Sequence, residues 1–232
     1  MNYVMSDIHG CYDKYLAMLE KIDFSSEDTL YILGDVIDRG DNGIDILLDM
    51  MKRRNVIPML GNHELMAFTV LEALNVEITE ENYSSQISDK VYRSLTHWTD
   101  NGGYPTYKAF TALNYVKRKR ILDYINDFIV YKELTVNGRD FLLVHAGLDN
   151  FSQGKPLEDY SIKELVWYRC NYNRVYFEDK YLVTGHTPTF YIDPSNKGRI
   201  YRKNFHIAID CGAVFGNPLS CICLDTLEEY YV

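Results

Sequence analysis

Five short polar clusters in this sequence carry side chains of the types that can bind metal ions and phosphate groups. In chain order they are SDIHG with Asp7 and His9, GDVIDRG with Asp35, Asp38 and Arg39, GNHE with Asn62 and His63, VHAG with His145, and TGH with His186. Each cluster directly follows an apolar run that is typical of a β-strand. Ligands of open α/β sheets bind beyond the carboxyl ends of the strands, so we expect the five clusters to meet in one site.

Taken singly, each cluster also fits an ordinary turn, because Asp, Asn and Gly are common where strands end. Their joint placement favours a metal site, since four of the six histidines stand at strand ends close to a glycine. A closed structural zinc site is disfavoured, because such sites are rich in thiolate ligands and no candidate ligand here is a cysteine.

The candidate ligands are two carboxylates, one amide oxygen and three imidazoles. Imidazole ligands favour Mn, Fe, Zn or Ni over Ca or Mg, so we expect two divalent transition-metal ions. Manganese is the first choice of metal, and iron and zinc are the alternatives. Asp35 can bridge them, because a carboxylate accepts on both sides. Two ions ~3.5–4 Å apart would hold a hydroxide and clamp a phosphoryl group for in-line attack.

Three neighbouring side chains would complete this chemistry. Arg39 offers a bidentate fork to phosphoryl oxygens. His63 is placed to protonate a leaving alkoxide, which histidine does well near neutral pH. Asp38 would accept a hydrogen bond from the His63 ring and fix its tautomer. The pattern therefore predicts metal-dependent hydrolysis of a phosphate ester.

An α/β fold must position these residues. Strands are expected over 2–6, 29–33 and 56–60, and helices over 11–22, 42–54 and 63–74. This alternation predicts βαβ units with parallel strands, and the continuous apolar runs predict a sheet covered on both faces. After the first strand we expect an extended segment that turns Asp7 and His9 to one side, with Ile8 in the core and Gly10 at the turn.

The second half is expected to be rich in hairpins, in a layered α/β fold. Asn137 and Gly138 form the favoured type I′ pair, and Ser161 with Glu164 forms a capping box. Further strands are expected over 181–186, 205–212, 219–226 and 228–232.

The stretch 75–126 is expected to be a helical insert, polar and loop-like at its start, within a single domain spanning 1–232. We expect the insert to overhang the site. Its aromatic residues would either flank a phosphopeptide or pack as core; they are Tyr83, Tyr92, Trp98 and Tyr104.

The five clusters together resemble the sequence pattern of calcineurin-like metallophosphoesterases. More narrowly, the chain resembles the serine/threonine phosphoprotein phosphatase (PPP) family in its compact bacterial and phage branch. The resemblance runs from residue 3 to about 226 and includes HWTDNGG at 97–103, LVWYR at 165–169 and IDCGAVFGNPLSCICLDT at 209–226. It implies a central β-sandwich flanked by helices and a dinuclear-metal protein phosphatase.

The resemblance also implies a role for each residue. Asp7 and His9 would hold the first metal, Asp35 would bridge, Asn62, His145 and His186 would hold the second, His63 would be the general acid paired with Asp38, and Arg39 and Arg169 would bind phosphate. Arg174 is a nearby alternative to Arg169.

Two other functions are weighed against a protein phosphatase. The first is a nucleotide hydrolase resembling symmetrical diadenosine tetraphosphatase, a group that typically shows GNHD where this chain has Glu64. The DRG sequence and the arginine of VWYR also favour the phosphatase. The second is a non-catalytic phosphoprotein-binding scaffold, which the complete ligand set argues against.

Composition and charge limit the kinds of partner and the cellular location that we expect for this chain. A net charge of −9 and a pI of about 5.1 disfavour nucleic-acid binding, which needs a basic face. No apolar run approaches the ~18 residues of a membrane span, and strand residues begin almost at Met1, where a signal peptide would lie. An odd count of 5 cysteines favours reduced thiols. We therefore expect a cytoplasmic enzyme acting on a phosphoprotein or a small phosphoester.

Overall fold

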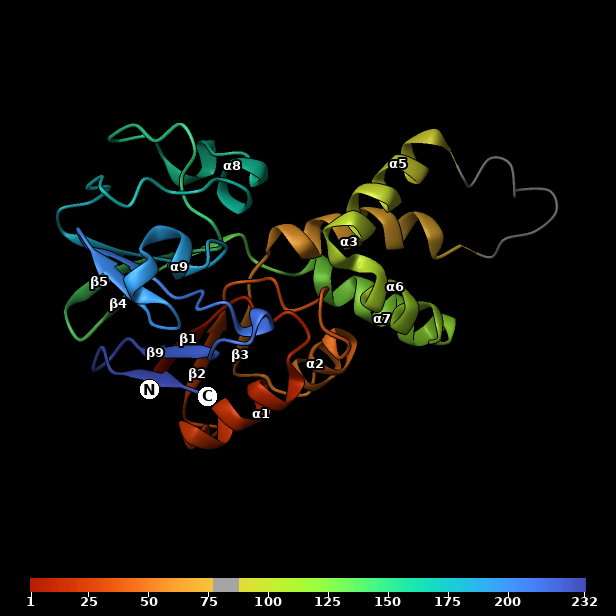
Figure 1. The fold of residues 1–232 in the computed structure, drawn as a ribbon, viewed down its shortest axis with the longest axis horizontal. Coiled ribbons are helices and arrows are strands. Elements are labelled where there is room, and N and C mark those ends of the chain that lie inside the picture. Colours follow the sequence, from red (N-terminus) through yellow and green to blue (C-terminus); the bar gives the residue numbers. More distant parts are fainter. Residues whose placement is uncertain (77–87) are drawn as a thin grey trace.

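Two five-stranded sheets lie face to face in the computed structural model, which describes residues 1–76 and 88–232 (Figure 1). The first sheet has the order β10-β9-β1-β2-β3, with β1 (Asn2–Met5), β2 (Thr29–Ile32), β3 (Val56–Pro58), β9 (Ser220–Cys223) and β10 (Glu229–Tyr231). The second has the order β4-β5-β6-β8-β7, with β4 (Tyr131–Val136), β5 (Arg139–Val144), β6 (Lys180–Thr184), β7 (Tyr201–Lys203) and β8 (His206–Ala208).

The strands are apolar on both faces because each sheet is covered on both sides. On β1, Val4 faces the second sheet, whereas Tyr3 and Met5 face the helices. On β5, Phe141 packs between the sheets and Leu142 packs outward. The predicted fold class, a mixed β-sandwich flanked by helices, is confirmed. Coverage of each sheet on both faces explains why its strands read as continuous apolar runs in the sequence.

Helices cover the outer faces and extend into a lobe beside the first sheet (Figure 1). Their bounds are α1 (Tyr12–Lys21), α2 (Gly43–Met50), α3 (Asn62–Leu74), α5 (Asp89–Trp98), α6 (Tyr104–Thr111), α7 (Tyr115–Asn126), α8 (Ile162–Val166) and α9 (Thr189–Ile192). The insert contributes α5, α6 and α7, with a π-helical turn over Thr99–Gly103. It packs on α3 and α2, and its first stretch, 77–87 with Tyr83, lies outside the described residues. No helix in the described ranges has the length and apolarity needed to cross a membrane.

The second half contains more parallel pairing than the sequence predicts. In the second sheet, strands β5, β6 and β8 run parallel, whereas β4 and β7 pair in antiparallel fashion with β5 and β8. The segments carrying α8 and α9 provide the crossover connections. The β4–β5 hairpin is as predicted, with positive φ at Asn137 and Gly138, and Ser161 caps α8 with Glu164.

Candidate metal centre

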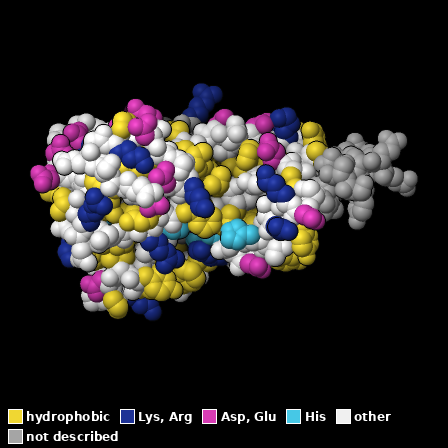
Figure 2. Space-filling model, turned by 90° about the horizontal axis from the view of Figure 1, so that it is seen from above, with side chains coloured by type: hydrophobic (Ala, Val, Ile, Leu, Met, Phe, Trp, Pro, Cys, Tyr) yellow, Lys and Arg dark blue, Asp and Glu magenta, His cyan; other side chains and the backbone are white. Residues whose placement is uncertain are grey.

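The candidate side chains meet where five strands end: β1, β2 and β3 of the first sheet and β5 and β6 of the second. Asp35 lies at the middle, and its Oδ2 is 3.6 Å from Nε2 of His9 and 3.5 Å from Nε2 of His145. Nε2 of His63 lies 3.9 Å from the same oxygen. All four side chains are buried. Figure 2 shows histidine side chains at the surface where the insert meets the sheets, with Lys and Arg side chains nearby.

Two groups of three potential ligands share Asp35. One joins it to His9 and His63, and the other joins it to His145 and His186. In each group the ligand atoms all lie within 4.8 Å of one another. A carboxylate shared by two such groups can bridge two ions, which agrees with the role expected for Asp35.

Backbone contacts orient the imidazole rings. Nδ1 of His9 lies 2.8 Å from the carbonyl oxygen of Ile37, and Nδ1 of His145 lies 2.6 Å from that of Leu33. A carbonyl oxygen only accepts, so each Nδ1 carries a proton, and Nε2, which faces Asp35, is the ring nitrogen left to bind a metal ion. Fixing the tautomer in this way is how proteins prepare histidine for metal binding.

An amide and a further carboxylate lie beside these two groups. Oδ1 of Asn62 lies 3.0 Å from Nε2 of His145 and 2.9 Å from Nδ1 of His186. Oδ2 of Asp7 accepts from the backbone N–H of His186 and the hydroxyl of Ser6, whereas its Oδ1 is buried without a hydrogen-bond partner in the described part of the chain. A buried carboxylate oxygen without a donor is costly, and a cation would satisfy it. This donor set therefore fits divalent transition-metal ions.

The turns that carry these residues are left-handed, not extended as the sequence suggests. Asp7 has φ 52° and His9 has φ 45°, and Asp35, Asp38, Arg39 and His186 also have positive φ. The segments after β1 and β2 run side by side, because the N–H of His9 donates to the carbonyl of Asp35 at 2.9 Å. The expected places of buried Ile8 and of Gly10, φ 70°, are confirmed. Such strained conformations gather at functional sites.

Glu64 fixes the turn after β2 through hydrogen bonds to backbone N–H groups. Its carboxylate accepts from the backbone N–H groups of Asp35 and Val36, each at 2.8 Å, and from that of Gly61 at 3.1 Å. The side chain is fully buried. The residue that separates GNHE from GNHD therefore bears on how the turn is built, and carries little weight as evidence for a particular phosphate substrate.

The structure brings together Asp38, Arg39 and His63, which the sequence predicts to supply the general acid and to bind phosphate. Nδ1 of His63 donates to Oδ2 of Asp38 at 2.7 Å, so Nε2 faces the centre. The Arg39 guanidinium contacts Nε2 of both His9 and His63. It lies beside the ligands, where a phosphoryl oxygen would enter.

Arg169 and Arg174 lie in different surroundings. Arg169 is exposed, and its charge lowers the pKa of His186, which places it near the centre. Arg174 instead packs over the ring of Phe151 at 4.7 Å and donates to that residue's carbonyl oxygen. Of the two arginines, Arg169 is therefore the one near the centre.

Burial and mutual charge set the protonation of the cluster. Burial opposes the charged form of His145, but the carboxylates of Asp35 and Asp7 outweigh it and raise the pKa of the ring to about 10. Burial raises the pKa of Asp7 to about 6. Burial, reinforced by the charge of His145, lowers the pKa of His186 to about 3. Without metal ions the His145 ring is therefore protonated near neutral pH, and a metal ion bound at Nε2 would have to displace that proton.

Mn²⁺ binding is therefore expected to release about one proton near neutral pH, because a ligating imidazole must be neutral. Affinity for Mn²⁺ should fall as the pH falls, first through competition at His145 and below about 6 also at Asp7. Calorimetric titrations in two buffers of different ionisation enthalpy measure the proton count. A binding heat that does not depend on the buffer would contradict this prediction.

Two buried side chains near the centre were not predicted as part of it. Asp210 follows β8, and its Oδ1 accepts from the backbone N–H of Gly212 at 2.8 Å. Burial and the neighbouring Asp7 raise its pKa well above the usual range. The rule that found the other clusters, a polar residue after an apolar strand, also points to Asp210. Trp98, expected to flank a peptide or pack as core, is fully buried and cannot flank a substrate.

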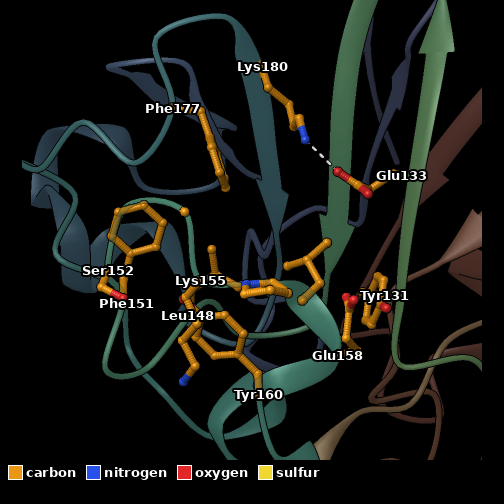
Figure 3. A pocket seen from close by; sticks show the side chains of 13 residues that line it. Tyr131, Glu133, Leu148, Phe151, Ser152, Lys155, Glu158, Tyr160, Phe177 and Lys180 are labelled. Atoms are coloured by element: carbon orange, nitrogen blue, oxygen red, sulfur yellow. Dashed lines mark hydrogen bonds and ion pairs between the residues drawn. The ribbon is translucent and has the colours of Figure 1, made fainter.

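A separate cavity of about 310 Å³ lies under the loop that follows β5 (Figure 3). Its lining includes Phe151, Tyr160 and Phe177, and none of the candidate site residues. Its two lysines are already engaged: Lys155 lies 3.7 Å above the Tyr160 ring and pairs with Glu164, and Lys180 pairs with Glu133. This cavity therefore lies apart from the candidate metal centre.

Comparison with known proteins agrees with this geometry. Residues 3–211 match the model of the calcineurin-like phosphoesterase family. The chain belongs to this family. It is a hydrolase of the phosphoesterase type. The family typically binds a dinuclear divalent metal site, and the His and Asp groups around Asp35 are candidate ligands for one.

Curated relatives of this phosphoesterase are symmetrical bis(5′-nucleosyl)-tetraphosphatases. That of Enterobacter sp. is 29% identical and that of Salmonella typhimurium 35%, each over 98 residues, which are 41% of this chain and 35% of the relative. The match thus spans about a third of the relatives' length. A solved structure of a putative diadenosine tetraphosphatase shares the fold at 16% identity with a TM-score of 0.65, covering 100% of this chain and 92% of that one.

Proposed function

We propose that this phosphoesterase cleaves its substrate by in-line displacement at phosphorus, with two divalent metal ions held around Asp35. The observation that carries the proposal is the position of Asp35 Oδ2, within 3.5–3.9 Å of Nε2 of His9, His63 and His145. Asp7 and His9 would hold one ion, and Asn62, His145 and His186 the other. Bound ions would polarise the phosphoryl oxygens and lower the pKa of a water molecule.

The chain's own residues handle the phosphate and the leaving group. Arg39 and Arg169 would bind non-bridging oxygens and offset their charge. As the bond from phosphorus to the leaving oxygen breaks, Nε2 of His63 would give that oxygen a proton, while water supplies the new oxygen on phosphorus. Asp38 accepts from Nδ1 and stabilises the charged ring before transfer.

The first substrate candidate is a dinucleoside tetraphosphate. The curated relatives favour this alternative over the phosphoprotein expected from the sequence. Phe215 also supports it, because its ring is 55% exposed and lies 5.6 Å from the Arg39 guanidinium. An exposed ring beside a phosphate-binding arginine suits stacking by a nucleobase.

A phosphoserine or phosphothreonine protein is the second candidate, and the Asp38–His63 pair favours it. A serine or threonine alkoxide needs a proton to leave, which a positioned general acid supplies. A nucleoside diphosphate leaves as a stable anion and needs the acid much less. This pair is therefore most useful on an alkyl phosphate monoester.

Side-by-side kinetics test these proposals on Mn²⁺-loaded protein of measured metal content. The substrates are diadenosine tetraphosphate and peptides carrying phosphoserine, phosphothreonine or phosphotyrosine. We expect the highest kcat/KM on diadenosine tetraphosphate, with ADP as product. A higher value on the phosphoserine or phosphothreonine peptide would establish the second candidate instead. Fully loaded protein that hydrolyses none of them would overturn the hydrolase mechanism.

Replacing Arg169 by alanine is expected to lower kcat/KM by about 10–100-fold, because a hydrogen bond to a charged group contributes about 1.5–3 kcal/mol. Arg174→Ala is the matched control, since that guanidinium packs on Phe151 and lies elsewhere. Its kcat/KM should stay close to wild type. The reverse result would show that the second phosphate arginine is Arg174.

A further inference from the structure

One buried side chain of the insert contacts the Asp38–His63 pair, which is proposed to act as the general acid. The indole Nε1–H of Trp98 donates to Oδ2 of Asp38 at 2.7 Å. The same oxygen accepts from Nδ1 of His63 at 2.7 Å. Trp98 and Asp38 are both fully buried, so water does not compete for this oxygen.

The insert also holds the backbone of the same turn. The N–H of Asp38 donates to the hydroxyl of Thr106 at 2.9 Å, and the N–H of Arg39 donates to the carbonyl of Gly102 at 2.8 Å. Asp38 and Arg39 have φ of 70° and 66°, a conformation that is strained for side chains of this kind. Contacts from the insert therefore stabilise the two residues that bind phosphate and support the acid.

Two glycines allow the insert to approach this closely. A Cβ on Gly103 would lie 2.5 Å from the indole nitrogen of Trp98. Gly102 has φ 96°, and a Cβ there would lie 2.8 Å from Cγ of Arg39. The HWTDNGG sequence is thus built so that the indole can lie against the chain and point its N–H at Asp38.

We propose that Trp98 is a positioning residue for the general acid, acting on His63 through Asp38. Oδ1 of Asp38 has no hydrogen-bond partner among the described residues, so the two donors on Oδ2 are what fix the carboxylate. A fixed carboxylate holds the His63 ring, and the ring then presents Nε2 to the leaving oxygen. The inference rests on the proposed function, since it assigns the insert a part in the same reaction.

Trp98→Phe tests the inference because it keeps a ring in the core and removes the N–H. Phe110→Leu is the matched control, since Phe110 is a fully buried aromatic residue of the insert with no polar atom to lose. Each variant is assayed on phenyl phosphate, whose leaving group needs a proton, and on p-nitrophenyl phosphate, whose leaving group does not. Metal content and thermal unfolding are measured alongside.

Trp98→Phe is expected to lower kcat on phenyl phosphate by about 10–100-fold, as loss of a supporting hydrogen bond does in comparable sites. Its kcat on p-nitrophenyl phosphate should fall much less, with metal content unchanged. Any decrease in kcat of Phe110→Leu should be equal on the two substrates. Equal losses on both substrates for Trp98→Phe would overturn the proposal, because they would show a packing role.

A second measurement does not depend on catalysis. In metal-free protein, the Nδ1 proton of His63 is followed by NMR through its exchange with solvent. We expect this proton to persist in wild type and in Phe110→Leu, and to exchange faster in Trp98→Phe. Unchanged exchange in Trp98→Phe would refute the positioning role even if no phosphate ester is hydrolysed, whereas failure of the hydrolase mechanism alone leaves this difference in place.

Discussion

Replacing His63 by asparagine is expected to lower kcat on phenyl phosphate by about 10²–10⁴-fold, the usual contribution of a general acid. The structure gives the reason, because Nδ1 is committed to Asp38 and Nε2 is the only ring atom left to give a proton. The loss should be far smaller on p-nitrophenyl phosphate. Trp98→Phe should reproduce this selectivity in weaker form.

The same variant separates two roles that the geometry allows for His63. Its Nε2 lies with His9 and Asp35 in a group close enough to bind an ion. A general acid can be removed without loss of metal, whereas a ligand cannot. We therefore expect His63→Asn to retain both ions in elemental analysis, and His97→Asn, at an exposed position, to retain both ions and wild-type kcat. Loss of one ion from His63→Asn would identify His63 as a ligand.

The positions of the candidate residues were predictable because strand ends are visible in the sequence. Asp7, His9 and Asp35 each follow an apolar run, and buried strands must turn where those runs stop. The turn geometry was not predictable in the same way. Left-handed φ at Asp7 and His9 depends on hydrogen bonds to the neighbouring turn after β2, which no local pattern reveals.

Contacts across long sequence separations were also hidden. Trp98 and Asp38 are 60 residues apart, and an indole in an amphipathic helix is usually read as core. Strand β7, with 3 residues, and helix α9, with 4, are too short to show a period. The parallel pairing of β5, β6 and β8 was therefore missed, although the hairpin before them was not.

Replacing Asp35 by asparagine should have the largest effect on the metal centre. Its carboxylate is shared by both groups of potential ligands, and its Oδ2 lies within 3.9 Å of Nε2 of His9, His63 and His145. The amide keeps the shape and removes the carboxylate charge, so both ions should bind much more weakly. Activity should fall by more than about 10³-fold, since metal ions contribute several kcal/mol to such transition states and each ~1.4 kcal/mol is tenfold.

Thermal unfolding measures this effect without any assay of hydrolysis. Mn²⁺ at about 100 times its Kd should stabilise the wild-type protein by about 2.7 kcal/mol, because it binds only the folded centre. A chelator should remove that stabilisation together with the activity, and added Mn²⁺ should restore both. Asp35→Asn should show no such shift, whereas Asp140→Asn, at an exposed position on β5, should respond like wild type. An Asp35→Asn protein that is stabilised by Mn²⁺ as strongly as wild type would mean that the ions are held elsewhere, and that the convergence of five strand ends on this carboxylate serves the fold alone.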